Sequence, residues 1–305
     1  MHLAVVGPFG FVVIDKPAGL TSHNCVSRLR RCFGLKRVGH GGTLDPAVTG
    51  VLPIALGAAT RLLPYLPGDK SYRGSIQLGR TTCTDDLEGE VLTSQGWPAL
   101  SANDLEAALQ SFRGPIKQRP PQVSAVHVDG VRAHARARRG EYMHLPTRPV
   151  TIHSLEMQGW DPNTGRLDLE VHCSAGTYIR SLARDLGEQI GCGGCLANLC
   201  RIQALGFHIG EASPLPEWPN EVHARSQILP PVLPPQQALK HLAAHEVSDT
   251  DREDWRCGRR LQLPNGLGSV GETVMVLHNS GQMLGLGLIE ADDELRPKIV
   301  FDARG

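Results

Sequence analysis

The sequence lacks several features that would assign it to a broad class at once. No apolar run approaches the roughly 20 residues that a membrane-spanning helix requires. The first residues show no basic patch followed by an apolar segment and a cleavage site. Net charge is also absent, because 31 Lys and Arg balance 31 Asp and Glu, and this argues against a general nucleic-acid binder. We therefore expect a cytoplasmic protein without membrane contact, and we find no internal repeat.

The chain also lacks a second C-x-x-C motif to accompany Cys192–Cys195. A structural zinc site needs four ligands, which usually come as two closely spaced pairs. The pair His241 and His245 follows about 45 residues later, far beyond a zinc-finger spacing. We therefore expect no metal. We interpret the eight cysteines as small thiols, mostly buried, because a cytosolic chain of this size does not need disulfides.

Length and charge distribution say more than net charge. The 305 residues allow about two domains, and a hydrophobic content of 41% allows a sizeable core. Residues 241–305 carry 7 Lys and Arg against 11 Asp and Glu, whereas residues 1–240 carry 24 against 20. Basic side chains form two clusters: Lys16, Arg28, Arg30, Arg31, Lys36 and Arg37, and later Arg132, Arg136, Arg138 and Arg139 with His134. Such clusters either follow a phosphate backbone or form solvated helix faces.

A glycine-rich stretch at residues 39–54 contains one aspartate, Asp45, with three glycines before it and one after it. Glycine permits left-handed backbone conformations and lets a ligand approach the chain closely. Pro46 fixes φ directly after the acid and biases Asp45 away from helical geometry. The apolar run at 51–56 predicts a buried strand that anchors the loop. The sequence thus predicts Asp45 on a stiff loop, and the plain alternative is a turn with a solvated carboxylate.

A strand, a turn and a helix precede this loop. The apolar run at 11–14 predicts the strand, and the pattern Lys-Pro-x-Gly-x-Thr-Ser at 16–22 predicts the turn. Ser22 is the predicted N-cap of a helix from 23 to about 33, whose apolar residues repeat at three and four.

Other candidate residues follow the loop. Tyr72 lies on the inner face of a strand predicted at 70–79. Tyr178 and Arg180 fall in the first turn of a helix that we expect to begin at 176, where a cation opposes the helix dipole and needs an anionic partner. Leu199 lies within an apolar segment further on. Read alone, these are a half-buried strand tyrosine and a surface Arg–Asp pair.

Taken together, these stretches resemble the motifs of the TruB family of pseudouridine synthases, which modify tRNA. The resemblance covers about residues 11–206, and the order and spacing of its four motifs make it specific. It implies an α+β protein with the pseudouridine synthase catalytic fold, a mixed and mainly antiparallel sheet flanked by helices. We expect this catalytic domain at residues 1–238, with an RNA-contacting insertion at about 115–145. Val123 stands where the family commonly has an aromatic residue, so we expect altered packing there.

The C-terminal residues 239–305 resemble the small β-rich, PUA-like domain of the family by position. Strands are predicted at 273–277, 283–289 and 298–301, and a helix at 249–257. The proline-rich segment 213–238 is expected to be a linker or an irregular connection between the two domains.

The resemblance implies isomerisation of uridine 55 in the T-loop of tRNA to pseudouridine, with the base flipped out of the loop. Asp45 matches the nucleophile, and Arg180 matches the cation that keeps it ionised in a dry pocket. The implied substrate-binding residues are His40, Tyr72, Tyr178, Arg180 and Leu199. His40 matches a histidine that fills the space the base vacates, although a capped turn histidine explains it equally well.

No redox step or group transfer occurs in this reaction, so no cofactor is expected. The expected partner is tRNA, with no obligate protein partner and a monomeric chain. Attack at the ribose C1′ and attack at the uracil C6 both remain open. Two other functions stay in view. A tRNA-binding or folding module without catalysis would explain the basic clusters, and a hydrolase with Asp45 as nucleophile would need a second acid that no motif supplies.

Overall fold

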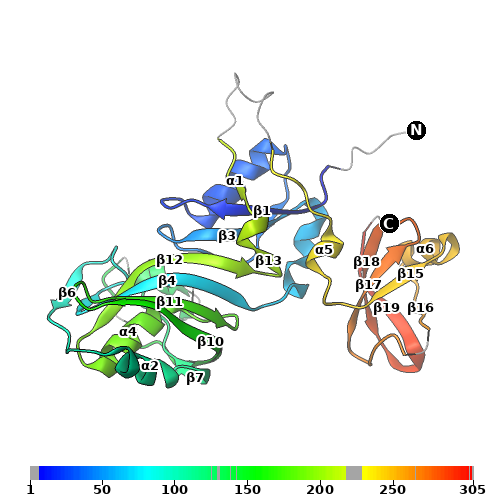
Figure 1. Ribbon diagram of the computed structural model, residues 1–305. Coiled ribbons are helices and arrows are strands. Elements are labelled where there is room, and N and C mark those ends of the chain that lie inside the picture. The colour runs from blue at the N-terminus through cyan, green and yellow to red at the C-terminus, as the bar shows by residue number, and fades with distance from the viewer. Residues whose placement is uncertain are drawn as a thin grey trace.

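The structure is a computed structural model that describes residues 7–124, 126–128, 131–137, 139–141, 143–217, 229–264, 266–301 and 303. Figure 1 shows a larger unit built on one long sheet and a smaller unit built on a second sheet, with the short helix α5 (Pro235–Ala238) between them. Among the described residues, no helix is both long and apolar enough to cross a bilayer.

The long sheet runs in the order β14-β1-β3-β12-β4-β11-β10-β7, with β2 added beside β3 and β13 beside β12. Most neighbours are antiparallel, and the pairs β1–β14 and β3–β12 are parallel, so the predicted mixed sheet is confirmed. Its strands are β1 (Gly10–Lys16), β2 (Val38–His40), β3 (Thr49–Leu56), β4 (Lys70–Leu78), β7 (Gly114–Gln118), β10 (Arg148–Asp161), β11 (Arg166–Cys173), β12 (Gly194–Ala204), β13 (Phe207–His208) and β14 (Ser213–Pro214).

Helices cover the sheet in two places. Helix α1 (Ser22–Cys32) packs on β1 and β3, and α2 (Ala102–Gln110) with α4 (Ile179–Ile190) packs on β4, β10 and β11. The remaining helical segments are η1 (Gly57–Tyr65), α3 (Ala133–Ala137), η2 (Ile209–Glu211), α6 (Asp249–Arg256) and η3 (Ala291–Asp293). Two small hairpins complete the larger unit: β5 (Arg80–Thr82) with β6 (Val91–Ser94), and β8 (His127–Val128) with β9 (Val131–Arg132).

The predicted cap of α1 is wrong by one residue. The N-cap is Thr21, whose hydroxyl accepts a hydrogen bond from the Asn24 backbone N–H at 3.1 Å. Ser22 is buried, and its hydroxyl instead accepts from the Leu44 backbone N–H at 2.9 Å. Both residue types cap helices well, so the sequence alone does not separate a capping hydroxyl from one that binds another loop.

One other predicted boundary shifts. Helix α4 begins at Ile179 with Tyr178 as its N-cap, so the predicted start at 176 is too early. Within the expected insertion, residues 127–128 form β8. Residues 114–118, which overlap the expected insertion, form β7 at the edge of the long sheet. The arginine group of the insertion is described in part: Arg138 lies outside the described residues, as do the side chains of Arg132 and His134.

The smaller unit is a β structure, as predicted. Its sheet runs in the order β15-β17-β18-β19-β16, and Trp255 of α6 is fully buried against it. Its strands are β15 (Ala244–Val247), β16 (Leu261–Gln262), β17 (Thr273–His278), β18 (Met283–Ile289) and β19 (Glu294–Val300). The predicted boundary at 238/239 coincides with the end of α5 and stays a prediction.

The two units share a hydrophobic cluster. Met275, Met283 and Phe301 of the smaller unit pack with Leu62 of η1 and with Leu239. The proline-rich connection is also attached to the larger unit where it is described, because β14 pairs with β1 and Leu233 exchanges two backbone hydrogen bonds with Phe11. In its described parts, residues 213–217 and 229–238, the segment is an irregular connection that is attached to the larger unit.

Candidate active site

The turn that follows β1 holds the Asp45 loop in place through hydrogen bonds. Lys16 is fully buried, and its ammonium group donates to the Pro46 carbonyl oxygen at 3.1 Å and to that of Leu20 at 2.7 Å. The Ser22 hydroxyl bonds the backbone of Leu44 on the other side of the acid. Lys16 and Ser22 of the first motif thus fix the backbone on both sides of Asp45.

Arg201 of β12 supports the same loop. This side chain is fully buried, and it donates from Nε to the Val51 carbonyl oxygen at 2.8 Å and from Nη2 to that of Gly42 at 3.1 Å. Gly50 has a φ of +99°, and a Cβ there would overlap the backbone of Arg201. Gly42 has a φ of +91°. The expected left-handed backbone is confirmed at these two glycines. The close approach at Gly50 is made by the Arg201 backbone, and the approach of a ligand stays a prediction.

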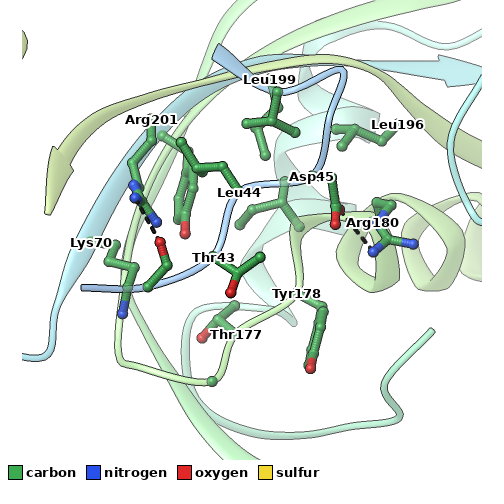
Figure 2. A pocket seen from close by; sticks show the side chains of 15 residues that line it. Thr43, Leu44, Asp45, Lys70, Thr177, Tyr178, Arg180, Leu196, Leu199 and Arg201 are labelled. Atoms are coloured by element: carbon green, nitrogen blue, oxygen red, sulfur yellow. Dashed lines mark hydrogen bonds and ion pairs between the residues drawn. The ribbon is translucent and has the colours of Figure 1, made fainter. Parts of the chain in front are cut away.

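Asp45 and Arg180 meet, as the sequence predicts. Arg180 Nη2 lies 2.8 Å from Asp45 Oδ2, and Figure 2 shows the two side chains pointing toward one another across the pocket wall. The Arg180 side chain is 7% exposed, whereas that of Asp45 is 45% exposed. The acid therefore faces an open pocket rather than the dry one that we expected, and a bound ligand would have to exclude water from it.

The Arg180 guanidinium is bound on every edge. It donates from Nη1 to the Thr84 carbonyl oxygen at 2.9 Å and from Nη2 to that of Val123 at 3.0 Å, and its Nε lies 3.6 Å from Asp86 Oδ2. A planar fork with five N–H donors suits such an arrangement. The helix dipole at the start of α4, which disfavours a cation, is offset by two carboxylates and two carbonyls.

A second ion pair fastens the loop that carries Asp86. Arg184 Nη1, one turn further along α4, lies 2.8 Å from Asp85 Oδ2. Burial raises the pKa of Asp85, and the Arg184 charge opposes that effect. Asp85 also adopts a φ of +62°, and its carbonyl oxygen accepts from the Leu196 N–H of β12. Asp85 thus holds the loop in place, and Asp86 on the same loop contacts the Arg180 guanidinium.

A pocket of about 260 Å³ opens beside the pair. It is slightly smaller than the roughly 300–1,000 Å³ of drug-sized ligand sites, which suits a single nucleoside. Five of the six predicted site residues line it, and His40, the last residue of β2, does not. The full lining is Gly42, Thr43, Leu44, Asp45, Val48, Lys70, Tyr72, Gly176, Thr177, Tyr178, Ile179, Arg180, Leu196, Leu199 and Arg201.

The charges of the lining favour an anionic or polar ligand. Its residues offer one carboxylate, already paired, against three cations, and Figure 2 shows Arg201 and Lys70 on the wall opposite Asp45 and Arg180. This donor set does not fit a metal ion, which needs several free oxygen, nitrogen or sulfur ligands. Leu199 and Leu196 close the upper side in the same view, and Tyr178 lies below.

Burial shapes the protonation of the inner wall. It raises the pKa of Tyr72 to about 12, with the Arg201 guanidinium acting in the opposite direction. It lowers the pKa of Arg201 and of Lys70, and it lowers that of His40, where Arg201 adds to the effect. The buried Nη1 of Arg201 has no hydrogen-bond partner of good geometry among the described residues.

The structure adds four residues to those that the sequence singled out: Lys16, Ser22, Asp86 and Arg201. The first two belong to a motif that we recognised but interpreted as a turn. Arg201 is fully buried behind the Asp45 loop. Its neighbour in sequence, Cys200, pairs with Thr49 at the base of that loop, so the strand register already placed Arg201 opposite Gly50.

The comparisons with known proteins agree over both units. The model of "TruB family pseudouridylate synthase (N terminal domain)" matches residues 30–179, and that of "Pseudouridine synthase II TruB, C-terminal" matches residues 243–301. The chain is 68% identical to the tRNA pseudouridine synthase B of Parasynechococcus marenigrum (strain WH8102), over 98% of this chain and 99% of that protein. It is 63% identical to the protein of the same name from Synechococcus sp. (strain WH7803), over 99% and 100%.

A solved structure shows the same fold at low identity. The crystal structure of a Cbf5-Nop10-Gar1 complex contains a chain with a TM-score of 0.71 and 24% identity, over 97% of this chain and 86% of that one. The family models, the close relatives and the fold lead to one conclusion: the chain belongs to the TruB family of pseudouridine synthases.

Proposed function

We propose that this protein isomerises uridine 55 in the T-loop of tRNA to pseudouridine, with Asp45 as the nucleophile, a flipped-out base and no cofactor. Family membership and relatives named tRNA pseudouridine synthase B support the reaction class and the substrate class. The single observation that carries the catalytic assignment is the 2.8 Å contact between Asp45 and Arg180 at the wall of a nucleoside-sized pocket.

The reaction is an isomerisation that needs one nucleophile. The substrate exchanges nothing with solvent except protons, since C5 loses one and N1 gains one. The bond between N1 and C1′ breaks, the uracil turns, and C5 forms the new bond to C1′. C5 then loses its proton, and N1 gains one. The Asp45 carboxylate attacks either C1′ or C6. Its bond breaks again when C5 bonds to C1′ on the first route, or by elimination from C6 on the second, so that atoms and charge balance. Arg180 stabilises the carboxylate once the RNA has excluded water.

The remaining lining residues would hold the nucleoside. Tyr72 offers a flat face to the base, and Leu199 and Tyr178 offer further walls. Because its pKa is raised to about 12, the Tyr72 hydroxyl stays protonated at neutral pH. It therefore acts as a hydrogen-bond donor or stacking surface in the resting site, and removing the C5 proton would require it to pass its own proton on. The positive charge of Arg201 on the pocket wall suits a uracil or phosphate oxygen.

Base flipping is needed because the target base must reach the pocket. A base inside a folded T-loop does not reach a pocket on the protein surface, so extrusion at about a few kcal/mol is needed before reaction. His40 lies outside the pocket lining. That location is compatible with a role in the space that the base leaves, and we retain this role as part of the proposal.

The test is release of tritium from C5 of uridine in a tRNA transcript. We expect release from one position, lost when uridine 55 is replaced by cytidine, and absent in the Asp45→Asn protein, which still binds tRNA. Release that persists in Asp45→Asn would overturn the nucleophile, and release from another position would overturn the site of modification. Binding without any release by the unaltered protein would identify a tRNA-binding module, and cleaved RNA or free uracil would identify a hydrolase.

A further inference from the structure

A row of polar side chains crosses the long sheet on the face opposite α2 and α4. Along β11, Leu169, Val171 and Cys173 point into the core beneath these helices, so His172 points to the other face. There, His172 lies beside Ser71 of β4, its direct partner across the strand pair. Figure 1 shows β4, β11 and β10 side by side in this region. This face has no part in the pocket described above.

A β-bulge brings a second histidine to the same place. Cys173 pairs with Ile152 and His172 pairs with Ser154, which leaves His153 of β10 as the extra, unpaired residue. In a regular strand His153 would point away from the face that Ser154 shares with His172, and a bulge re-aims the side chain. The rings of His153 and His172 lie 5.0 Å apart.

A carboxylate completes the group. Asp69, directly before β4, has its Oδ2 at 3.5 Å from His153 Nε2, and one ligand atom from each of Asp69, His153 and His172 lies within 4.8 Å of the others. Two ligands of tetrahedral zinc, at bonds of about 2.0–2.1 Å, are about 3.4 Å apart. The observed 3.5 Å between two of the three atoms is close to that separation.

The neighbours of His172 fix the nitrogen that would bind. Its Nδ1 lies 2.9 Å from Ser71 Oγ, and that hydroxyl donates its single proton to Gln203 Oε1 at 3.2 Å. With that hydroxyl proton given to Gln203, the His172 tautomer that completes the network carries its proton on Nδ1 and its lone pair on Nε2. Metal-binding histidines ordinarily donate their other N–H to such a partner, which sets the tautomer and the ring orientation.

We propose that Asp69, His153 and His172 form a binding site for a divalent metal ion of the zinc class, with water as the fourth ligand. Two imidazoles and one carboxylate are the donors that Zn²⁺, Co²⁺ and Ni²⁺ accept, and hard ions such as Mg²⁺ would prefer more oxygen. The ion would be structural rather than catalytic. It would join the chain at Asp69, where β4 begins with pocket residues Lys70 and Tyr72, to β10 and β11.

The test is Co²⁺ and Zn²⁺ binding to the full chain, in a background in which the exposed Cys83 and Cys257 are changed to Ala so that they do not compete. We expect one equivalent of Zn²⁺ with a dissociation constant in the micromolar range or tighter, and a Co²⁺ absorption spectrum of nitrogen and oxygen ligands without thiolate charge-transfer bands. Zn²⁺ should also raise the unfolding temperature.

Two variants and a control locate the site. His153→Gln and Asp69→Asn change exposed side chains, and each should weaken binding by at least tenfold and abolish the rise in unfolding temperature. The control His208→Gln alters an exposed histidine elsewhere and should bind as before. Absence of saturable binding, a thiolate spectrum, or unchanged affinity in both variants would overturn the proposal. RNA modification is not part of this readout, so the proposed function stands or falls separately.

Discussion

Arg180 contacts a second carboxylate, Asp86, whose Oδ2 lies 3.6 Å from its Nε. The guanidinium therefore lies between two acids, one fixed in the β5–β6 loop and one on the glycine-rich loop. Asp86 also accepts hydrogen bonds at Oδ1 from the Thr84 hydroxyl and the Glu88 N–H, so its own position is determined. Such a buried, fully bound cation offers Asp45 a partner in one defined direction.

The planar fork of Arg180 should be irreplaceable by lysine. Lysine keeps the charge but cannot reach Asp45, Thr84 and Val123 at once from a single nitrogen. We expect Arg180→Lys to fold and to lower the single-turnover rate of C5 hydrogen release by about a hundredfold or more. The control Arg73→Lys alters an exposed arginine of β4 and should keep the full rate. A normal rate in Arg180→Lys would show that only the charge matters.

Asp86 should act through Arg180. In Asp86→Asn the amide oxygen can still accept from Thr84 and Glu88, so the change removes little besides the charge near Nε. Because the 3.6 Å contact is an ion pair and not a hydrogen bond, its loss costs about 1 kcal/mol, which corresponds to a rate lower by about fivefold. Single-turnover release at saturating tRNA measures this. Glu88→Gln, an exposed change in the same loop, is the control, and equal rates in both variants would contradict the role.

The sequence predicted the ion pair of Asp45 and Arg180, because two motifs far apart in the chain specify these two residues. Strands β1, β3 and β4 were also predicted, since their apolar periodicity is clear. Asp86 escaped notice because a carboxylate in a polar loop gives the same local pattern whether it caps a turn or binds a buried arginine from another element.

Arg201 illustrates a second limit. An arginine in a strand is typical both of a phosphate contact and of a buried clamp, and the difference depends on which strand lies beside it. The parallel pairing of β3 with β12 puts Arg201 opposite Gly50. That pairing joins segments about 150 residues apart, and no local pattern reports it. His153 is similar, because its bulge depends on register between β10 and β11.

Removing the Arg201 clamp should affect both stability and rate. In Arg201→Gln the carbonyl groups of Gly42 and Val51 lose their donors, at about 1–3 kcal/mol for each group left unpaired. We expect a lower free energy of unfolding in urea and, at temperatures where the variant is folded, a lower rate of C5 hydrogen release. Arg73→Gln, which breaks an exposed pair with Glu170, should cost less than about 1 kcal/mol. An equal loss of unfolding free energy in Arg201→Gln and Arg73→Gln would show that Arg201 does not stabilise the Asp45 loop.

Buried thiols should weaken the fold at alkaline pH. Burial raises the pKa of Cys173 from 9.0 to about 11, and this side chain is fully buried. Between these values the unfolded chain releases the thiol proton while the folded chain keeps it. Stability is therefore complete below about pH 9 and falls as pH rises toward 11, by about 2–3 kcal/mol for one such thiol.

Urea unfolding at pH 8 and pH 10.5 tests this. The loss of stability between the two values should be smaller in Cys173→Ala than in the unaltered protein, even though the substitution lowers stability at pH 8 by leaving a small cavity. Cys83→Ala changes an exposed thiol and should leave the pH dependence as it is. Cys195, whose pKa burial also raises to about 11, should behave like Cys173. An identical alkaline loss in Cys173→Ala would mean that this thiol ionises in the folded chain as readily as in the unfolded one.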